Sequence, residues 1–160
     1  MPYIIDGSNL LRTIESDDER FAPLDQYQLC WTISRFLGRL GEEGQLVFDG
    51  TGPDDRSRLD NVHHLEVRYA GTRTDADTVI EAFIKAFPNP QGLIVVSSDR
   101  RLRGAAMHHR AQALASDVFW EVVLKKMQEK RAPREPFSKR HGLSESETEH
   151  WLDVFGIDEG

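Results

Sequence analysis

The chain has 160 residues, of which 39% are hydrophobic and 29% are charged, and its one cysteine is Cys30. This length fits a single domain with its own core. A lone cysteine excludes an internal disulfide framework and a four-cysteine zinc site, and its apolar surroundings predict a buried thiol. No apolar run approaches the ~18 residues of a membrane span, and a strand-like run from Tyr3 leaves no room for a signal peptide. We therefore expect a cytoplasmic protein that contacts no membrane.

The net charge of −7 opposes a nucleic-acid partner only if it is evenly spread. Residues 97–140 contain 11 Lys or Arg against 5 Asp or Glu, whereas the last twenty residues contain 6 acids and no Lys or Arg. Because local fields attract phosphates more than the total charge repels them, the basic segment keeps RNA among the expected partners.

The amino-terminal half alternates strand-like and helix-like segments. Pro2–Asp6 is a short apolar run that predicts a buried strand, and the polar stretch after it carries no prediction of a helix or strand. Apolar residues recur at three- and four-residue steps from Leu24 to Leu40, which predicts an amphipathic helix. Gln45–Asp49 predicts a second buried strand, and the alternation in His64–Tyr69 predicts a third.

The second half continues the alternation. A helix is predicted from Asp75 to Phe87, before two prolines, and Leu93–Ser97 is the most hydrophobic run and so the best candidate for a central strand. A helix from Arg100 to His109, a short strand at Ala111–Leu114 and a helix from Ser116 to Lys130 follow. Four or five strands separated by helices, with no tight hairpin, predict βαβ units and a parallel sheet.

The carboxy-terminal segment differs from this pattern in composition. Residues 1–130 are expected to form the domain, and residues 131–143, which contain two prolines and five charged residues, are expected to form a linker. Residues 144–156 predict a short amphipathic helix with a capping box at Ser144 and Glu147. A helix of this length is unstable alone, so we expect it to dock on the body or on a partner.

Several aspartates follow predicted strands directly or begin the next helix. In an open α/β sheet the carboxyl ends of parallel strands share one edge, and ligands bind there. Carboxylates gathered at one edge repel one another unless a cation lies between them, and an all-oxygen set favours Mg²⁺ or Mn²⁺. The aspartates of this pattern are Asp6, Asp49, Asp75, Asp77 and Asp99.

Each of these acids also has a local structural explanation. Asp6 and Asp49 each precede glycine and could start turns. Asp75 and Asp99 could cap the helices that follow them, and Asp77 could complete a capping box with Thr74. The joint pattern at one edge favours a metal site more than any single residue does.

Neutral and basic side chains are predicted near the same edge. Asn9 follows Asp6 by three residues and could donate to a phosphate or a metal-bound water, although an N-cap or Asx turn is equally consistent with its position. Ser97 and Ser98 could bind a phosphate or orient Asp99. Four arginines could bind phosphate oxygens, with solvated surface charge as the alternative for each: Arg73, Arg100, Arg101 and Arg103.

In chain order, the segments YIIDGSNLL, QLVFDG, TDADTVIEAFI, LIVVSSDRRLR and QALASDVFWEVV resemble the NYN domains, which are relatives of the PIN-like nucleases, and most of all their YacP-like branch. The opening Asp-Gly-x-Asn is matched by Asp6, Gly7 and Asn9. The Ala-Asp pair of the middle helix is matched by Ala76 and Asp77, and the Ser-Asp or Thr-Ser-Asp that ends the central strand is matched by Ser97, Ser98 and Asp99. The resemblance covers roughly residues 3–125.

The resemblance implies a Rossmann-like three-layer fold and a metal-dependent endoribonuclease. By the same resemblance, Asp6, Asp77 and Asp99 hold one or two Mg²⁺ or Mn²⁺ ions, and Asn9 completes the catalytic set. Asp49, Asp75 and Ser98 are expected to support these residues. The family also suggests that the RNA is presented by a larger assembly such as a ribosome, and nothing in the sequence indicates the oligomeric state.

Three other functions are alternatives to nuclease activity. Some NYN and PIN relatives bind RNA or partners without cleavage, so a non-catalytic adaptor is the main alternative. A phosphatase of the haloacid-dehalogenase type needs Asp-x-Asp after the first strand, whereas this chain has Asp6-Gly7-Ser8. A dinucleotide-binding enzyme is disfavoured because no G-x-G-x-x-G follows the first strand.

Overall fold

The structure is a computed structural model that describes residues 1–59 and 62–129. The predicted linker and the predicted carboxy-terminal helix lie outside the described residues. Two 3₁₀ turns, Ser57–Leu59 and Pro90–Gly92, lie between the main elements. Those elements, in chain order, are β1 (Tyr3–Asp6), α1 (Gly7–Glu15), α2 (Gln26–Leu40), β2 (Gly44–Phe48), β3 (Leu65–Tyr69), α3 (Ala76–Ala86), β4 (Ile94–Val96), α4 (Arg100–His108), β5 (Gln112–Leu114) and α5 (Ser116–Gln128).

The five strands form one parallel sheet in the order β3-β2-β1-β4-β5. This confirms the predicted parallel α/β architecture, and all five predicted strand runs are present. Leu93–Ser97 supplies β4, which lies inside the sheet as its hydrophobicity indicated, although the middle position belongs to β1. The order changes direction at β1, which places the topological switch point between β1 and β4.

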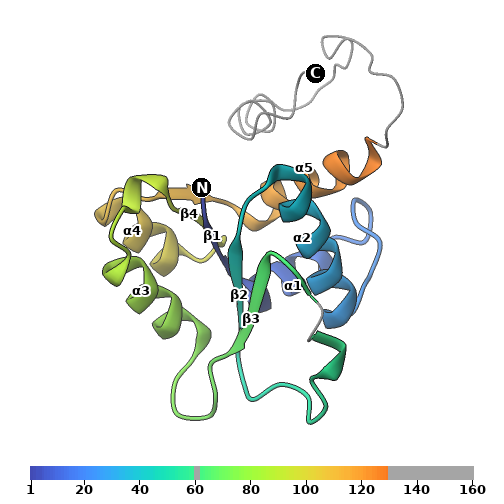
Figure 1. The fold of residues 1–160 in the computed structure, drawn as a ribbon, viewed down its shortest axis with the longest axis horizontal. Coiled ribbons are helices and arrows are strands. Elements are labelled where there is room, and N and C mark those ends of the chain that lie inside the picture. Colours follow the sequence, from blue (N-terminus) through green and yellow to red (C-terminus); the bar gives the residue numbers. More distant parts are fainter. Residues whose placement is uncertain (60–61, 130–160) are drawn as a thin grey trace.

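Helices cover both faces of the sheet and make three layers (Figure 1). Successive side chains of β1 point to opposite faces of the sheet. Ile5 therefore lies in the core shared with α1, α2 and α5, and Ile4 lies in the smaller core shared with α3 and α4. Cys30 lies buried in the larger core with a free thiol, as predicted. Among the described residues, no helix is long and apolar enough to cross a membrane.

The sequence does not predict helix α1, because the stretch after Asp6 is mainly polar. The helix begins directly at the end of β1, and the Asp6 carboxylate caps it by accepting the Asn9 backbone N–H at 3.2 Å. Leu10 and Ile14 then lie one turn apart and are fully buried. A short apolar face and a strong N-cap therefore make a helix of a segment whose composition is mainly polar.

Candidate active site

The carboxyl edge of the sheet gathers the strand ends of β1, β2 and β4 and the beginning of α3. Asp6 ends β1 and is only 3% exposed. Asp49 follows β2, Asp99 caps α4 after β4, and Asp77 lies in the first turn of α3. Four acids that are separated by up to 93 positions in the sequence thus face one edge of the fold.

Asp77 is the carboxylate that interacts electrostatically with all the others. Burial raises the pKa of Asp77, and the negative charges of Asp99, Asp75 and Asp49 raise it further, against the opposing effect of Arg101. Its own charge acts in turn on Asp6. These acids are therefore close enough to repel one another, which is the condition that a bound cation relieves.

Asp6 carries the largest shift among the acids of the edge. Burial raises the pKa of Asp6 from 3.8 to about 6, hydrogen bonds from Asn9 and Ser97 oppose the increase, and the charge of Asp77 adds to it. Each carboxylate oxygen accepts one hydrogen bond: Oδ1 from the Asn9 N–H, and Oδ2 from the Ser97 hydroxyl at 3.1 Å. Ser97 Oγ also accepts the Asp99 N–H at 3.0 Å, so this buried hydroxyl joins the strand ends of β1 and β4.

Asp49, Asp75 and Asp99 all bind backbone N–H groups at helix starts. Asp49 Oδ1 accepts the Ala76 N–H at 2.8 Å, which ties the end of β2 to the residue before Asp77. Asp75 caps α3 through the Thr78 N–H at 2.8 Å, and Asp99 caps α4 through the Arg101 N–H at 2.8 Å. Both expected cap roles are present, and the alternative capping box of Thr74 and Asp77 is wrong because Asp75 is the N-cap.

The acids are adjacent without forming a closed ligand set. Among the described residues, no three His, Cys, Asp or Glu side chains lie in positions from which they could hold one metal ion. The oxygens of Asp6 and Asp99 instead accept hydrogen bonds from Ser97 and from helix N–H groups.

Two serines and Asn9 form a second network beside the carboxylates. Asn9 neither caps a helix nor forms an Asx turn with its side chain. Its Oδ1 accepts the Ser98 N–H at 3.0 Å and the Ser116 hydroxyl at 2.7 Å. Ser116 was missed from sequence, although it lies in the Ala-Ser-Asp that follows the fifth strand, as Ser98-Asp99 follows the fourth.

The arginines expected to bind RNA differ in how far the fold engages them. Arg101 donates to Glu81 through Nε at 3.1 Å and Nη2 at 2.9 Å, so its guanidinium is occupied by α3. Arg103 donates to the Ser97 carbonyl at 3.4 Å. Arg73 and Arg100 are exposed and make none of the side-chain hydrogen bonds or ion pairs found in the described part of the chain.

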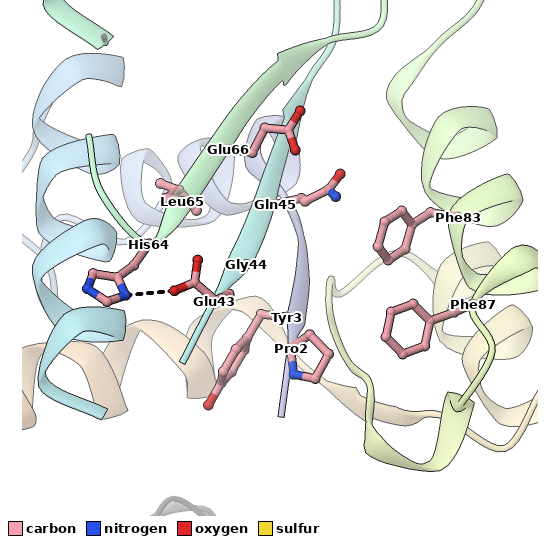
Figure 2. Close-up of a pocket in the computed structure, with 10 residues that line it drawn as sticks. All are labelled: Pro2, Tyr3, Glu43, Gly44, Gln45, His64, Leu65, Glu66, Phe83 and Phe87. Atoms are coloured by element: carbon pink, nitrogen blue, oxygen red, sulfur yellow. Dashed lines mark hydrogen bonds and ion pairs between the residues drawn. The ribbon is translucent and has the colours of Figure 1, made fainter. Parts of the chain in front are cut away.

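A cavity of about 350 Å³ lies at the opposite, amino edge of the sheet (Figure 2). Phe83 of α3 and Phe87, the residue after that helix, face it from one side, and Gln45 of β2 and Glu66 of β3 face it from the other (Figure 2). None of the aspartates at the carboxyl edge lines this cavity, which therefore does not belong to the acidic site.

Comparison with known proteins identifies the family. The model of the YacP-like NYN domain matches residues 3–155, whereas curated proteins give no match. A structure of Rae1 (YacP) from Bacillus subtilis superposes with a TM-score of 0.61 at 18% identity, covering 78% of this chain and 74% of that one. A tryptophan-to-leucine mutant of that protein gives 0.59 at 19% identity, covering 78% and 75%.

At such identities the structural likeness shows the fold alone, which is PIN-like. The family model, by contrast, spans nearly the whole chain and includes every acid of the edge described above. The chain belongs to the YacP-like NYN domain family of the PIN-like nuclease superfamily.

Proposed function

We propose that this protein is a metal-dependent endoribonuclease that hydrolyses RNA phosphodiester bonds at the carboxyl edge of its sheet. Asp6, Asp77 and Asp99 are the residues that would hold one or two Mg²⁺ or Mn²⁺ ions. The observation that carries the proposal is the position of Asp77, whose pKa is raised by burial and by Asp99, and whose charge raises that of Asp6. One buried carboxylate beside partly buried ones, whose repulsion Arg12 and Arg101 offset only in part, is a donor set that suits a divalent ion.

Such an ion, when bound, supplies positive charge beside the phosphate and a water of lowered pKa. The chain's own residues prepare the site. Ser97 orients the Asp6 carboxylate by its hydrogen bond, and Asp49 fixes the start of α3, from which Asp77 projects. Because repulsion keeps free carboxylates apart, we expect the side chains of Asp77 and Asp99 to rotate inward when the ion binds.

The substrate is held by groups around the acids. Asn9 and Ser98 are proposed to position the scissile phosphate, and the exposed Arg73 and Arg100 to contact neighbouring phosphates, an attraction that weakens as salt rises. A cytoplasmic location, expected from the sequence, and an RNA target presented by a ribosome, suggested by the family alone, extend the proposal.

Replacing Asp99 by Asn tests the proposal without removing a helix cap, because Asn caps helices as well as Asp does. We expect wild-type protein to cleave single-stranded RNA in Mn²⁺, to stop in EDTA, and to lose at least ~100-fold in rate in Asp99→Asn, since a metal contributes several kcal/mol to such a transition state. Denaturing gels of end-labelled RNA measure the cleavage.

Asp25→Asn is the matched control. Asp25 caps α2 through the Gln28 N–H at 2.8 Å, as Asp99 caps α4, but it is not among the acids of the edge. Equal cleavage in Mn²⁺, in EDTA and by Asp99→Asn would contradict the proposal. RNA binding with no cleavage under any condition would instead identify an adaptor.

A further inference from the structure

The direction of the Asn9 side-chain amide is fixed by two donors. The Ser98 backbone N–H, which can only donate, lies 3.0 Å from one terminal atom of Asn9, so that atom is the carbonyl oxygen Oδ1. The Ser116 hydroxyl donates to the same oxygen at 2.7 Å. The amide nitrogen Nδ2 must therefore point away from both serines.

Ser116 is held as firmly as the residue that it contacts. It is the first residue of α5 and is fully buried. Its backbone N–H donates to Ser98 Oγ at 3.0 Å while its hydroxyl donates to Asn9. Ser116 therefore joins the start of α5 to the loop after β4 and to α1, although 107 positions separate it from Asn9.

The two N–H groups of Asn9 Nδ2 are the part of this network that has no acceptor among the described residues. Within the described part of the chain, Nδ2 makes no hydrogen bond, whereas Oδ1 makes two. The Asn9 backbone N–H binds Asp6 Oδ1, so this donor pair belongs to the residue that contacts the buried acid. Neutral donors held in a fixed direction suit a phosphate oxygen at an edge where carboxylates repel free anions.

We propose that Ser116 is a positioning residue that, together with the Ser98 N–H, aims the Asn9 amide so that Nδ2 donates to a non-bridging oxygen of the RNA phosphate. The inference rests on the proposed nuclease function. It adds to the site Ser116, a buried residue that carries no carboxylate. Without the Ser116 hydroxyl, the Asn9 side chain keeps one of its two anchors and gains rotational freedom. The phosphate then loses a donor that was oriented in advance.

A double-mutant cycle separates this role from a general loss of stability. We expect Ser116→Ala to lower kcat/KM by about tenfold, as the loss of one hydrogen bond predicts. Asn9→Ala should lower it at least as much. The combined variant should be no slower than Asn9→Ala alone, because Ser116 acts through Asn9. Multiplied losses in the combined variant would overturn the proposal.

Ser34→Ala provides the matched control for removing a buried hydroxyl. Ser34 is 5% exposed and donates to the His63 carbonyl at 2.6 Å, which is also a bond between a serine and a distant element. The Ser34→Ala variant should lose about as much thermal stability as Ser116→Ala and should cleave RNA at the wild-type rate. If Ser34→Ala slowed cleavage as much as Ser116→Ala, loss of stability would explain both and the positioning role would be wrong.

A second readout does not depend on cleavage. In ¹⁵N-labelled Asp99→Asn protein with Mg²⁺, a short single-stranded oligoribonucleotide should shift the Asn9 side-chain NH₂ signals, which Asn9→Ala identifies by their disappearance. Adding Ser116→Ala should remove most of that shift. The inference would be overturned if the Asn9 side-chain signals did not shift when RNA is added, or if they shifted equally without the Ser116 hydroxyl. Absence of wild-type cleavage would instead contradict the proposed nuclease while leaving this comparison decisive.

Discussion

Asp77→Asn should greatly slow RNA cleavage and at the same time make the metal-free protein more stable. Burial and the charges of Asp99, Asp75 and Asp49 raise the pKa of Asp77, so its ionised form is disfavoured in the fold. Its side chain makes no hydrogen bond in the described part of the chain, and an amide of the same shape removes the repulsion. Loss of a ligand should cost at least ~100-fold in cleavage rate.

The attraction of a carboxylate to the start of a helix opposes the predicted gain. Asp77 lies in the first turn of α3, where negative charge usually stabilises by about 0.3–1 kcal/mol. The raised pKa shows that repulsion and burial exceed this effect, so the melting temperature in EDTA should rise modestly. Cleavage by Asp77→Asn at the wild-type rate would remove Asp77 from the site, and a lower melting temperature would refute the repulsion.

The pH dependence of stability should change when a divalent ion is added, with Asp6 as the cause. The pKa of Asp6 is about 6 in the fold against 3.8 ordinarily. Between pH 3.8 and 6 the folded chain binds the Asp6 proton more tightly than the unfolded chain does. The stabilisation of the fold by this proton is therefore complete below pH 3.8 and is lost as pH rises through 6. For a nearly buried group, this difference in pKa corresponds to about 3 kcal/mol of folding free energy.

A cation beside Asp6 favours the ionised form and should restore that stability. We expect Mn²⁺ to raise the melting temperature little at pH 5 and much more at pH 7.5, as measured by thermal denaturation with and without EDTA. In Asp6→Asn both the loss of stability between pH 4 and 7 and the response to Mn²⁺ should be smaller. An identical pH profile in the two proteins would show that Asp6 does not titrate in this range.

Strand ends and helix caps were predictable because they depend on short-range patterns. Asp75 and Asp99 were expected as caps from their place before apolar helical runs, and both cap their helices. The sequence indicated that Asp6 is a turn residue or a ligand, yet Asp6 caps α1. This helix was not predicted because its composition is mainly polar. The burial of Asp6 depends on β1 being the middle strand, which is a property of the strand order.

The hydrogen bonds of the second network could not be inferred from the sequence. The bond between Ser116 and Asn9 joins residues 107 positions apart, and the bond between Ser97 and Asp6 spans 91. Both require β4 to pair with β1 on the side away from β2, and the bond from Ser116 also requires β5 to lie next to β4. The occupied guanidinium of Arg101 likewise depends on α3 and α4 packing together. Of the four arginines, Arg101 and Arg103 therefore make side-chain hydrogen bonds within the described residues, whereas Arg73 and Arg100 make none there.

Anomalous diffraction from a crystal soaked in Mn²⁺ tests most directly whether this carboxyl edge is a metal site. The account predicts a manganese peak bridging the carboxylates of Asp6, Asp77 and Asp99, with the side chains of Asp77 and Asp99 rotated toward it. Oxygen–metal distances should be about 2.0–2.6 Å, as for oxygen-ligated divalent ions. Full soaking with no peak at this edge, and with Asp6 and Asp99 still bonded only to helix N–H groups and Ser97, would contradict it.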